Sequence, residues 1–465
     1  MTDLRTFTTP VGTVLARHED DVVRALGIPY AQADRFAAPR PVPAFTEPFE
    51  ALSPAPVAPQ PESGYVGSLL HPMPDVVSDE HCQRLSITMP ADVSADERLP
   101  VMVWIHGGSY VIGGGDLPIY DPRELVLEQR VVVVAVTFRL GVLGFLGGRT
   151  SSSSSARDRR TRRDRRTRRP RSDRPRTDLP ANLGLLDLVE ALRWVRTNIS
   201  AFGGDPDRVT VFGQSAGGDA TAHLMISDGT RGLFQRAIIQ SAPLGISRRR
   251  ARMTRALLRA VGTIDSDTPV DEVIARQVAA ERATARFGLR GGMPFGTQYG
   301  HAPLPPERRA SEAWRSVAPE FDVLIGSAAD EAAMFLPAVP ALRATVRSRP
   351  LRALVRWLLV RPLSEIIYGR DVRRFRDRHR AAGGHAVSYR LRHGATTRPT
   401  GAVHMSDLPL LLGGRDAWAG SPFVAARDWP AVAERGRRLR AVWAEFARTG
   451  RVDAPDDAGI TFDRG

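Results

Sequence analysis

The sequence predicts a doubly wound α/β fold, in which helices cover both faces of a mostly parallel central sheet. Two observations support this prediction. Short β-branched runs alternate along the chain with longer segments whose apolar residues have helical spacing. The short runs are also apolar almost throughout, as expected of parallel strands buried on both faces. With 465 residues, of which 42% are hydrophobic, the chain is expected to form one domain over residues 1–465.

The individual elements are predicted from these patterns. Residues 11–30 predict a small N-terminal antiparallel hairpin. Apolar runs predict strands at 101–105, 131–138, 209–212, 237–240 and 323–325, and helical spacing predicts helices at 185–199, 219–225 and 270–287. No apolar run reaches the roughly 18 residues that cross a bilayer, and residues 1–10 lack a signal-peptide pattern. We therefore expect a cytoplasmic protein that does not enter the membrane.

Composition restricts the possible partners. Cys82 is the only cysteine, so no intramolecular disulfide or thiolate metal cluster can form, and we expect a small buried residue there. The formal net charge is +14. Thirteen arginines against three aspartates between Arg149 and Arg176 give 13 − 3 = +10, which leaves +4 for the rest of the chain. The remainder of the protein is therefore nearly balanced in charge.

The Arg/Ser-rich segment at residues 149–178 contains a tandem repeat, Asp158 to Arg163 followed by Asp164 to Arg169. It has no apolar residue larger than alanine or proline, so it cannot bury enough surface to offset the entropy of ordering. We expect a disordered insertion. Nucleic acid could bind only through Arg157 to Arg176, and because no aromatic residue stands there to stack on bases, we expect no nucleic-acid partner.

The pentapeptide Gly213-Gln214-Ser215-Ala216-Gly217 matches the G-x-S-x-G elbow that exposes a nucleophilic serine. It lies directly between a predicted strand and a predicted helix, which is the order that the elbow requires. A second glycine-rich turn, His106-Gly107-Gly108-Ser109-Tyr110, follows the strand at 101–105. Acyl transfer needs backbone N–H groups aimed at one oxyanion. We expect these donors in this turn and at the amide of Ala216.

A serine is inert at neutral pH without a base to remove its proton and a carboxylate to orient that base. His223 lies about 12 Å along the predicted helix from Ser215 and is too distant. His106 belongs to the glycine-rich turn. His404 follows the last strand-like run and stands late in the chain, where the order Ser, acid, His places the base. Asp330 and Glu331 both follow the strand at 323–325, and the residues alone do not decide between them.

Several segments in this order resemble the type B carboxylesterases, the α/β-hydrolase family that includes the cholinesterases. Besides the elbow, they are residues 25–31, 79–90, 104–110, 138–145, 182–187, 201–206 and 443–450. The resemblance implies an α/β-hydrolase fold and a catalytic triad of Ser215, Glu331 and His404. It implies oxyanion donors at Gly108, Ser109 and Ala216, and no metal or organic cofactor.

The chain also departs from that family. Gln214 replaces the glutamate that usually precedes the serine, and Cys82 has no partner for the disulfide of secreted relatives. The loop between Glu62 and Asp79 has Tyr65 but no tryptophan, so we expect no aromatic cage for choline esters. The arginine-rich segment is an insertion relative to the family. The chain ends about fifteen residues past its Phe-Ala-Arg-Thr-Gly motif, where relatives usually continue.

The resulting hypothesis is a serine carboxylesterase that acts on neutral small to medium esters through an acyl-enzyme intermediate. The alternative is a noncatalytic or weakly active protein of the same fold, from a decayed gene, with an anion-binding arginine loop. Retention of all three triad residues favours the enzyme. The acyl and alcohol specificity and the oligomeric state have no readable signature in the sequence.

Overall fold

The computed structural model describes residues 3–62, 76–94, 96–147, 180–338, 349–394, 402–421, 423–424, 428–457 and 459–464. The predicted insertion at 149–178 and the loop residue Tyr65 lie outside the described residues.

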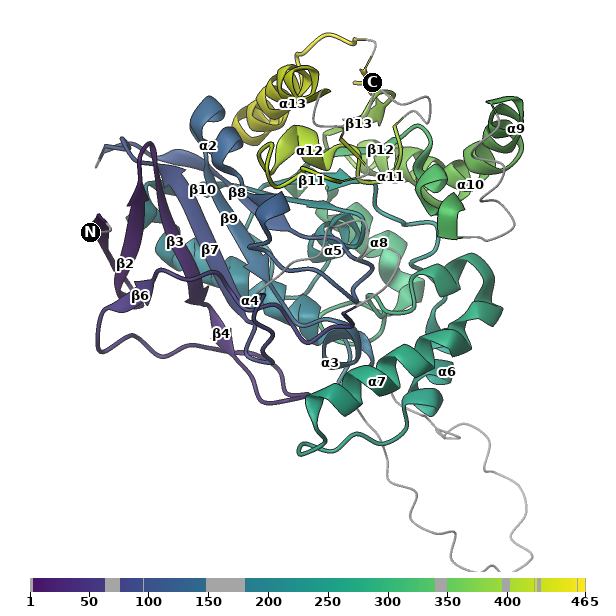
Figure 1. Ribbon diagram of the computed structural model, residues 1–465, viewed down its shortest axis with the longest axis horizontal. Coiled ribbons are helices and arrows are strands. Elements are labelled where there is room, and N and C mark those ends of the chain that lie inside the picture. Colours follow the sequence, from purple (N-terminus) through teal and green to yellow (C-terminus); the bar gives the residue numbers. More distant parts are fainter. Residues whose placement is uncertain are drawn as a thin grey trace, which may run out of the picture.

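Twelve of the described strands form one sheet that runs through the molecule (Figure 1). From β9 to β13 every neighbouring pair is parallel, and the strands on either side pair antiparallel except β6, which lies parallel to β2. The order is β1 (Leu4–Thr9), β2 (Gly12–Glu19), β3 (Val22–Pro29), β7 (Arg84–Pro90), β9 (Val132–Thr137), β8 (Leu99–Ile105), β10 (Gly204–Gln214), β11 (Arg236–Gln240), β12 (Asp322–Ala328), β13 (Ala386–Leu391) and β14 (Ile460–Asp463). Strand β6 (Phe49–Ala51) pairs with β2, and β4 (Ala31–Gln32) pairs with β5 (Arg40–Pro41) apart from this sheet.

The α-helices connect and cover these strands. They are α2 (Arg123–Gln129), α3 (Gly141–Phe145), α4 (Leu183–Asn198), α5 (Ala216–Leu224), α6 (Ala251–Val261), α7 (Val270–Glu281), α8 (Ala310–Val317), α9 (Arg349–Val355), α10 (Arg361–Ser364), α11 (Arg370–Ala381), α12 (Leu408–Leu411) and α13 (Trp429–Thr449). Single turns of 3₁₀-helix include η1 (Pro118–Tyr120), η2 (Ile199–Phe202), η4 (Glu307–Arg309) and η5 (Ala318–Glu320). Longer 3₁₀ segments are η3 (Arg282–Gly292) and η6 (Glu331–Ala338), and π-helical turns η8 (Arg356–Val360) and η9 (Glu365–Gly369) flank α10.

Successive side chains of a strand point to opposite faces of the sheet, which divides the core in two. On β8, Val101, Val103 and Ile105 face one cluster, whereas Met102 and Trp104 face the other. The first cluster packs against α4, α5, α6 and α7, and the second against α2, α12 and α13. Figure 1 shows these two groups of helices on different sides of the sheet. Burial on both faces thus accounts for the apolar residues at successive positions of β8.

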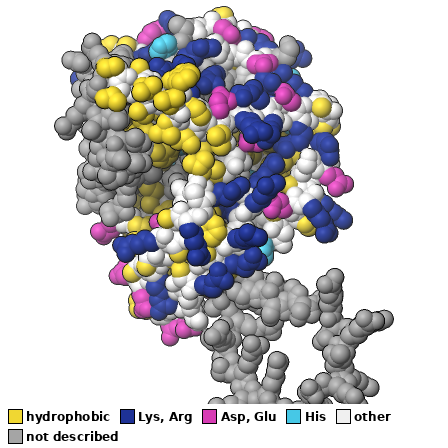
Figure 2. Space-filling model, turned by 90° about the vertical axis from the view of Figure 1, so that its right-hand side faces the viewer, with side chains coloured by type: hydrophobic (Ala, Val, Ile, Leu, Met, Phe, Trp, Pro, Cys, Tyr) yellow, Lys and Arg dark blue, Asp and Glu magenta, His cyan; other side chains and the backbone are white. Residues whose placement is uncertain are grey.

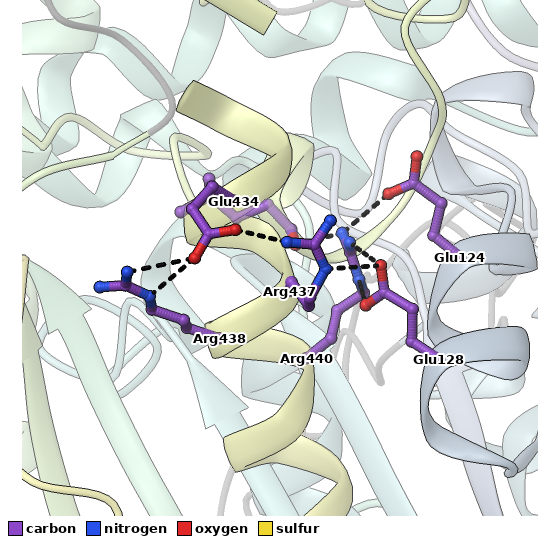
Figure 3. Close-up of polar contacts among 7 residues, drawn as sticks. Glu124, Glu128, Glu434, Arg437, Arg438 and Arg440 are labelled. Carbon is purple, nitrogen blue, oxygen red and sulfur yellow. Dashed lines mark hydrogen bonds and ion pairs between the residues drawn. The ribbon is translucent and has the colours of Figure 1, made fainter. Parts of the chain in front are cut away.

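A buried ion-pair cluster holds α13 against α2 (Figure 3). The side chain of Arg440 is 2% exposed, and its guanidinium contacts Glu124 Oε2 at 2.9 Å and Glu128 Oε1 at 2.6 Å. Burial raises the pKa of Glu124, and the Arg440 charge opposes that rise. A buried guanidinium needs carboxylate partners of this kind. The cluster therefore fixes α13 over the second core, where Trp443 reaches β11.

The fold prediction is confirmed, with differences in individual elements. The N-terminal hairpin is present as β2 and β3, and β1 adds a third antiparallel strand. The α-helix predicted at 270–287 ends at Glu281 and continues as 3₁₀-helix. Strands β13 and β14 were not predicted, because Ala386–Leu391 mixes serine, tyrosine and arginine with apolar residues and Ile460–Asp463 is short. In the part of the chain that the structure describes, no helix combines the length and apolar character needed to span a bilayer.

Candidate active site

The predicted site residues follow the carboxyl ends of neighbouring parallel strands. The register pairs Ile105 of β8 with Gly213 of β10, and Gln214 of β10 with Gln240 of β11. Gln240 in turn pairs with Gly326 of β12. The segments that leave β8, β10, β11 and β12 therefore emerge side by side at one edge of the sheet. This edge is where ligands bind in open α/β sheets.

Ser215 occupies the sharp turn between β10 and α5. Its backbone has φ 59° and ψ −121°, a combination that non-glycine residues rarely adopt. The turn is held by a hydrogen bond from the Ser215 amide to the carbonyl of Gln240, at 2.8 Å. A Cβ atom on Gly217 would lie 2.0 Å from the carbonyl oxygen of Ile105, so the helix can approach β8 only with glycine there. The elbow therefore presents Ser215 in the strained geometry that the motif predicts.

The structure brings Ser215, His404 and Glu331 together in one hydrogen-bonded chain. Nε2 of His404 lies 2.8 Å from Oγ of Ser215, and Nδ1 of His404 lies 2.5 Å from Oε2 of Glu331. The Glu331 side chain is fully buried and that of His404 is 3% exposed. Rings of Phe335 and Tyr368 flank the imidazole, with centroids 5.7 and 5.3 Å away. This arrangement lets His404 accept a proton from the serine while the carboxylate fixes its tautomer.

The geometry also separates Glu331 from its neighbour Asp330. The carboxylate of Asp330 turns away and pairs with the guanidinium of Arg356, at 2.9 and 2.6 Å. Glu331 Oε1 accepts hydrogen bonds from the Ser241 hydroxyl and the Ala328 amide, each at 2.6 Å, which leaves Oε2 for His404. Of the two adjacent carboxylates, only Glu331 contacts the imidazole.

The glycine-rich turn after β8 lies against the elbow. A Cβ atom on Gly107 would sit 3.2 Å from the Ser215 side chain, and Gly108 has a φ of +109° that favours glycine. Gly108 and Ser109 line the same pocket as Ser215 and His404. Within the described residues, the amides of Gly108, Ser109 and Ala216 have no hydrogen-bond acceptor, so they are available to an oxyanion.

The other candidate histidines are engaged elsewhere. His106 is buried, its Nδ1 lies 2.8 Å from the Gly107 carbonyl oxygen, and burial lowers its pKa to about 4. On α5, His223 Nε2 lies 2.9 Å from the hydroxyl of Tyr299, and Nδ1 lies 2.7 Å from the Asp219 carbonyl oxygen. Neither ring contacts Ser215, as the sequence spacing predicted for His223.

Sequence reasoning missed a buried polar layer beneath the triad. Ser241 donates to Glu331, and Gln240 Nε2 donates to Asp407 Oδ2 at 2.7 Å. The indole of Trp443 donates to Gln240 Oε1 at 3.3 Å, which connects α13 to this layer. Asp407 stands three residues after His404, in the turn that precedes α12, and no local sequence pattern distinguishes it from other acidic residues.

Burial raises the pKa of Asp407 to about 6; the hydrogen bond from Gln240 opposes this rise and the charge of Glu331 adds to it. In the folded chain the carboxyl group therefore keeps its proton up to about pH 6, against about pH 4 in the unfolded chain. Between these values the folded state binds more protons, so this group makes the protein less stable as the pH rises.

The Asp407→Asn variant is expected to be more stable than wild type at pH 8, by roughly 1–3 kcal/mol, because it removes a buried charge but keeps an acceptor for Gln240. Urea unfolding at pH 5 and pH 8 measures the difference. The gain should shrink at pH 5, where the wild-type carboxyl is mostly protonated. An equal gain at both pH values would contradict the assignment.

A pocket of about 460 Å³ opens over Ser215. Its wall is mainly apolar and comes from the segments after β11 and β12 and from the helical run η8–η9, including Ile246, Met293, Met334, Phe335, Leu363 and Ile367. Helix α9 and the helical run that follows it also carry exposed apolar side chains, at Leu351, Leu354, Trp357, Leu358 and Ile366. Figure 2 looks onto this side of the molecule, where apolar side chains gather beside arginines.

The model of the carboxylesterase family matches residues 5–155 and 173–350, which is most of the chain. The chain belongs to the carboxylesterase family. The matched ranges omit residues 156–172, which lie within the arginine-rich segment.

Proteins similar to this chain over most of its length are also hydrolases and esterases. The carboxylesterase is 35% identical to a probable N-octanoylanthranilate hydrolase of Rhodococcus erythropolis, over 97% of this chain and 94% of the relative. It is 31% identical to the para-nitrobenzyl esterase of Bacillus subtilis, over 95% and 89%. Among solved structures, a thermophilic para-nitrobenzyl esterase aligns with a TM-score of 0.72 at 28% identity, covering 99% of this chain and 97% of that one. The predictions of fold and family are thereby confirmed.

Proposed function

We propose that this carboxylesterase hydrolyses neutral carboxylic esters through an acyl-enzyme intermediate on Ser215. The observation that supports this most strongly is the hydrogen-bonded chain from Ser215 Oγ through His404 to Glu331, with distances of 2.8 and 2.5 Å. A noncatalytic protein of the same fold would have no use for this alignment at the base of an open pocket.

The mechanism has two steps. Ser215 Oγ attacks the ester carbonyl carbon while His404 Nε2 takes its proton, and the amides of Gly108, Ser109 and Ala216 hold the oxyanion. The tetrahedral intermediate collapses as the imidazolium donates its proton to the departing alcohol. A water molecule then attacks the acyl-enzyme by the same route and releases the acid, with Glu331 stabilising the charged imidazolium in both steps.

The lining of the pocket supports the proposal that the substrates are neutral esters with an apolar acyl or alcohol group of small to medium size. Its walls consist of leucine, isoleucine, methionine and phenylalanine side chains around Ser215. The names of two relatives contain groups of this kind, an octanoyl group on the anthranilate amide and the para-nitrobenzyl group of an ester. Among the residues that the structure describes, no charged side chain lines this pocket apart from the imidazole of His404 when it is protonated.

A stoichiometric burst tests the covalent mechanism. Wild-type enzyme mixed with a p-nitrophenyl dimethylcarbamate is expected to release one equivalent of p-nitrophenol per chain, because the carbamoyl-enzyme is hydrolysed slowly. Ser215→Ala should release none in the same time. Turnover without a burst, or a burst that survives in Ser215→Ala, would exclude the proposal.

Acyl length should change kcat/KM in a predictable way. Each added methylene buried in the apolar pocket contributes about 0.8 kcal/mol, or roughly fourfold, so the p-nitrophenyl hexanoate is expected to react on the order of a hundredfold faster than the acetate. The gain should stop once the chain exceeds the pocket. A panel of p-nitrophenyl esters from acetate to palmitate measures the profile, and a profile that declines steadily from acetate would contradict the apolar acyl site.

We further propose one catalytic domain that works in a reducing compartment such as the cytoplasm. One continuous sheet joins residues from Leu4 to Asp463, which supports a single unit. The single thiol, Cys82, is fully buried in the first core, and burial raises its pKa, so it is held as an unreactive neutral thiol. Fractionation of cells that express the full chain tests the location.

A further inference from the structure

The glycine-rich turn after β8 contains two consecutive non-glycine residues with left-handed backbone conformations. Ser109 has a φ of 58° and Tyr110 has a φ of 60°. Residues with a Cβ atom rarely adopt this conformation, and they keep it only where the surrounding contacts hold them in place. The amide of Ser109 is one of the three donors assigned to the oxyanion. The contacts that hold this turn therefore also hold an oxyanion donor.

Tyr110 makes several of these contacts. Its hydroxyl donates a hydrogen bond to Oδ2 of Asp219 at 2.8 Å, and both residues are at most 1% exposed. Its ring packs against that of Phe145, with centroids 4.5 Å apart. Its backbone carbonyl accepts a hydrogen bond from the Gly141 amide at 2.7 Å. The turn is thus attached to α3 through Gly141 and Phe145, and to α5 through Asp219.

The hydrogen bond to Asp219 joins a neutral hydroxyl to a carboxylate. Burial raises the pKa of Asp219, but its contact with His223 opposes that rise. The Tyr110 hydrogen bond and the Arg250 charge act in the same direction as His223, and the pKa is lowered below its usual value. Burial and the Asp219 charge raise the pKa of Tyr110 well above its usual value, so the hydroxyl keeps its proton. The other contacts of Asp219 Oδ2, with Thr297 Oγ1 and His223 Nδ1, are longer, at 3.4 Å each. The bond from Tyr110 is therefore charge-assisted, a class roughly twice as strong as neutral hydrogen bonds.

Asp219 belongs to the helix that presents the remaining oxyanion donor. Ala216 is the first residue of α5, and Asp219 lies three residues further along the same helix. The hydrogen bond from Tyr110 therefore joins the turn that carries two donors to the helix that carries the third. Oxyanion donors are effective only when they point at one position. Within the described residues, neither Tyr110 nor Asp219 lines the ester pocket, so the bond acts on the backbone rather than on the substrate.

We propose that Tyr110 and Asp219 are positioning residues, which together hold the two parts of the oxyanion hole at the separation that the tetrahedral intermediate requires. This inference rests on the proposed function, because it assigns a role within the same acyl-transfer site. Loss of the hydrogen bond releases the Ser109 amide from its strained position. Stabilisation of the tetrahedral intermediate then weakens, whereas binding of the intact ester to the apolar walls does not change.

The Tyr110→Phe variant of the full chain tests this role, because it removes the hydroxyl and keeps the ring against Phe145. For p-nitrophenyl butyrate we expect kcat to fall by about 10- to 100-fold and KM to change by less than about threefold, since a displaced donor affects mainly the transition state. An alkyl trifluoromethyl ketone adds to Ser215 Oγ as a tetrahedral alkoxide while His404 takes the proton. Its inhibition constant should rise by the same factor by which kcat/KM falls.

Tyr30→Phe is the matched control. Tyr30 is also 1% exposed, lies in the first core, and donates its hydroxyl to the Thr137 carbonyl at 2.9 Å. Both variants lose one buried hydrogen bond from a tyrosine, so their thermal midpoints should fall by similar amounts. Only Tyr110→Phe should change kcat and the inhibition constant of the ketone.

Asp219→Asn is the second variant, and it keeps the test valid if Tyr110→Phe does not fold. Its amide oxygen can still accept from Tyr110, so kcat should fall less than in Tyr110→Phe, and the double variant should lose no more than Tyr110→Phe alone. Wild-type kcat in Tyr110→Phe, a raised KM with an unchanged inhibition constant, or losses that multiply in the double variant would overturn the inference. Absence of the acyl-enzyme burst in the wild type would instead overturn the proposed function, and this inference with it.

Discussion

Replacement of Ser215 by alanine is expected to lower kcat for p-nitrophenyl esters by about 10⁶-fold, close to the loss found when a serine nucleophile is removed from other hydrolases. The reason is that neither His404 nor the oxyanion donors can form a covalent intermediate alone. Residual activity about 10³-fold above the uncatalysed rate should remain from binding and the oxyanion site. Initial rates at saturating ester measure the change.

The fold should not change in this variant, because the elbow depends on backbone contacts rather than on the hydroxyl. The Ser215 amide still donates to the Gln240 carbonyl, and the thermal midpoint should stay within a few degrees of wild type. Ser316→Ala, at an exposed position on α8, is the control and should keep full activity. A loss of less than tenfold in Ser215→Ala would contradict the assignment of the nucleophile.

The second large effect is expected at Glu331, where substitution by glutamine should lower kcat by about 10⁴-fold. The Ser241 hydroxyl and the Ala328 amide both donate to Oε1 of Glu331. In the glutamine variant these two donors require the amide oxygen at that position, so the NH₂ group faces His404 Nδ1. The imidazole must then carry its proton on Nε2, which points at Ser215 and prevents it from acting as a base.

Asp330→Asn provides the matched comparison at the adjacent position. The Asp330 carboxylate is buried and pairs with Arg356 rather than with His404, so its neutralisation should lower stability by roughly 1–3 kcal/mol but change kcat less than tenfold. Steady-state kinetics with both variants separates the two carboxylates. Equal losses in both variants would show that the network, rather than Glu331 alone, controls the histidine.

The parts of the site that the sequence could predict are local ones. The elbow around Ser215 and the turn at Gly108 are recognisable because backbone geometry restricts the residues there to glycine and small side chains. The chain order of serine, acid and base also placed His404. In contrast, Glu331 and Asp330 are equivalent by sequence, and only the resemblance to a family favoured one over the other.

The parts that the sequence could not predict depend on contacts between distant segments. Ser241, Gln240 and Asp407 support the triad from β11 and the start of α12, and Trp443 reaches them from α13. None of them stands in a local pattern, because their positions follow from the register of parallel strands.

Covalent labelling by a fluorophosphonate, which mimics the tetrahedral intermediate, tests most directly whether Ser215 is the nucleophile. One phosphonyl group per chain is expected by intact-mass measurement, and fragmentation of the tryptic peptide Val209–Arg231 should place it on Ser215. Labelling should be lost in Ser215→Ala and strongly slowed in His404→Ala. An adduct on another residue, or no adduct on an enzyme that still hydrolyses esters, would contradict Ser215 as the nucleophile.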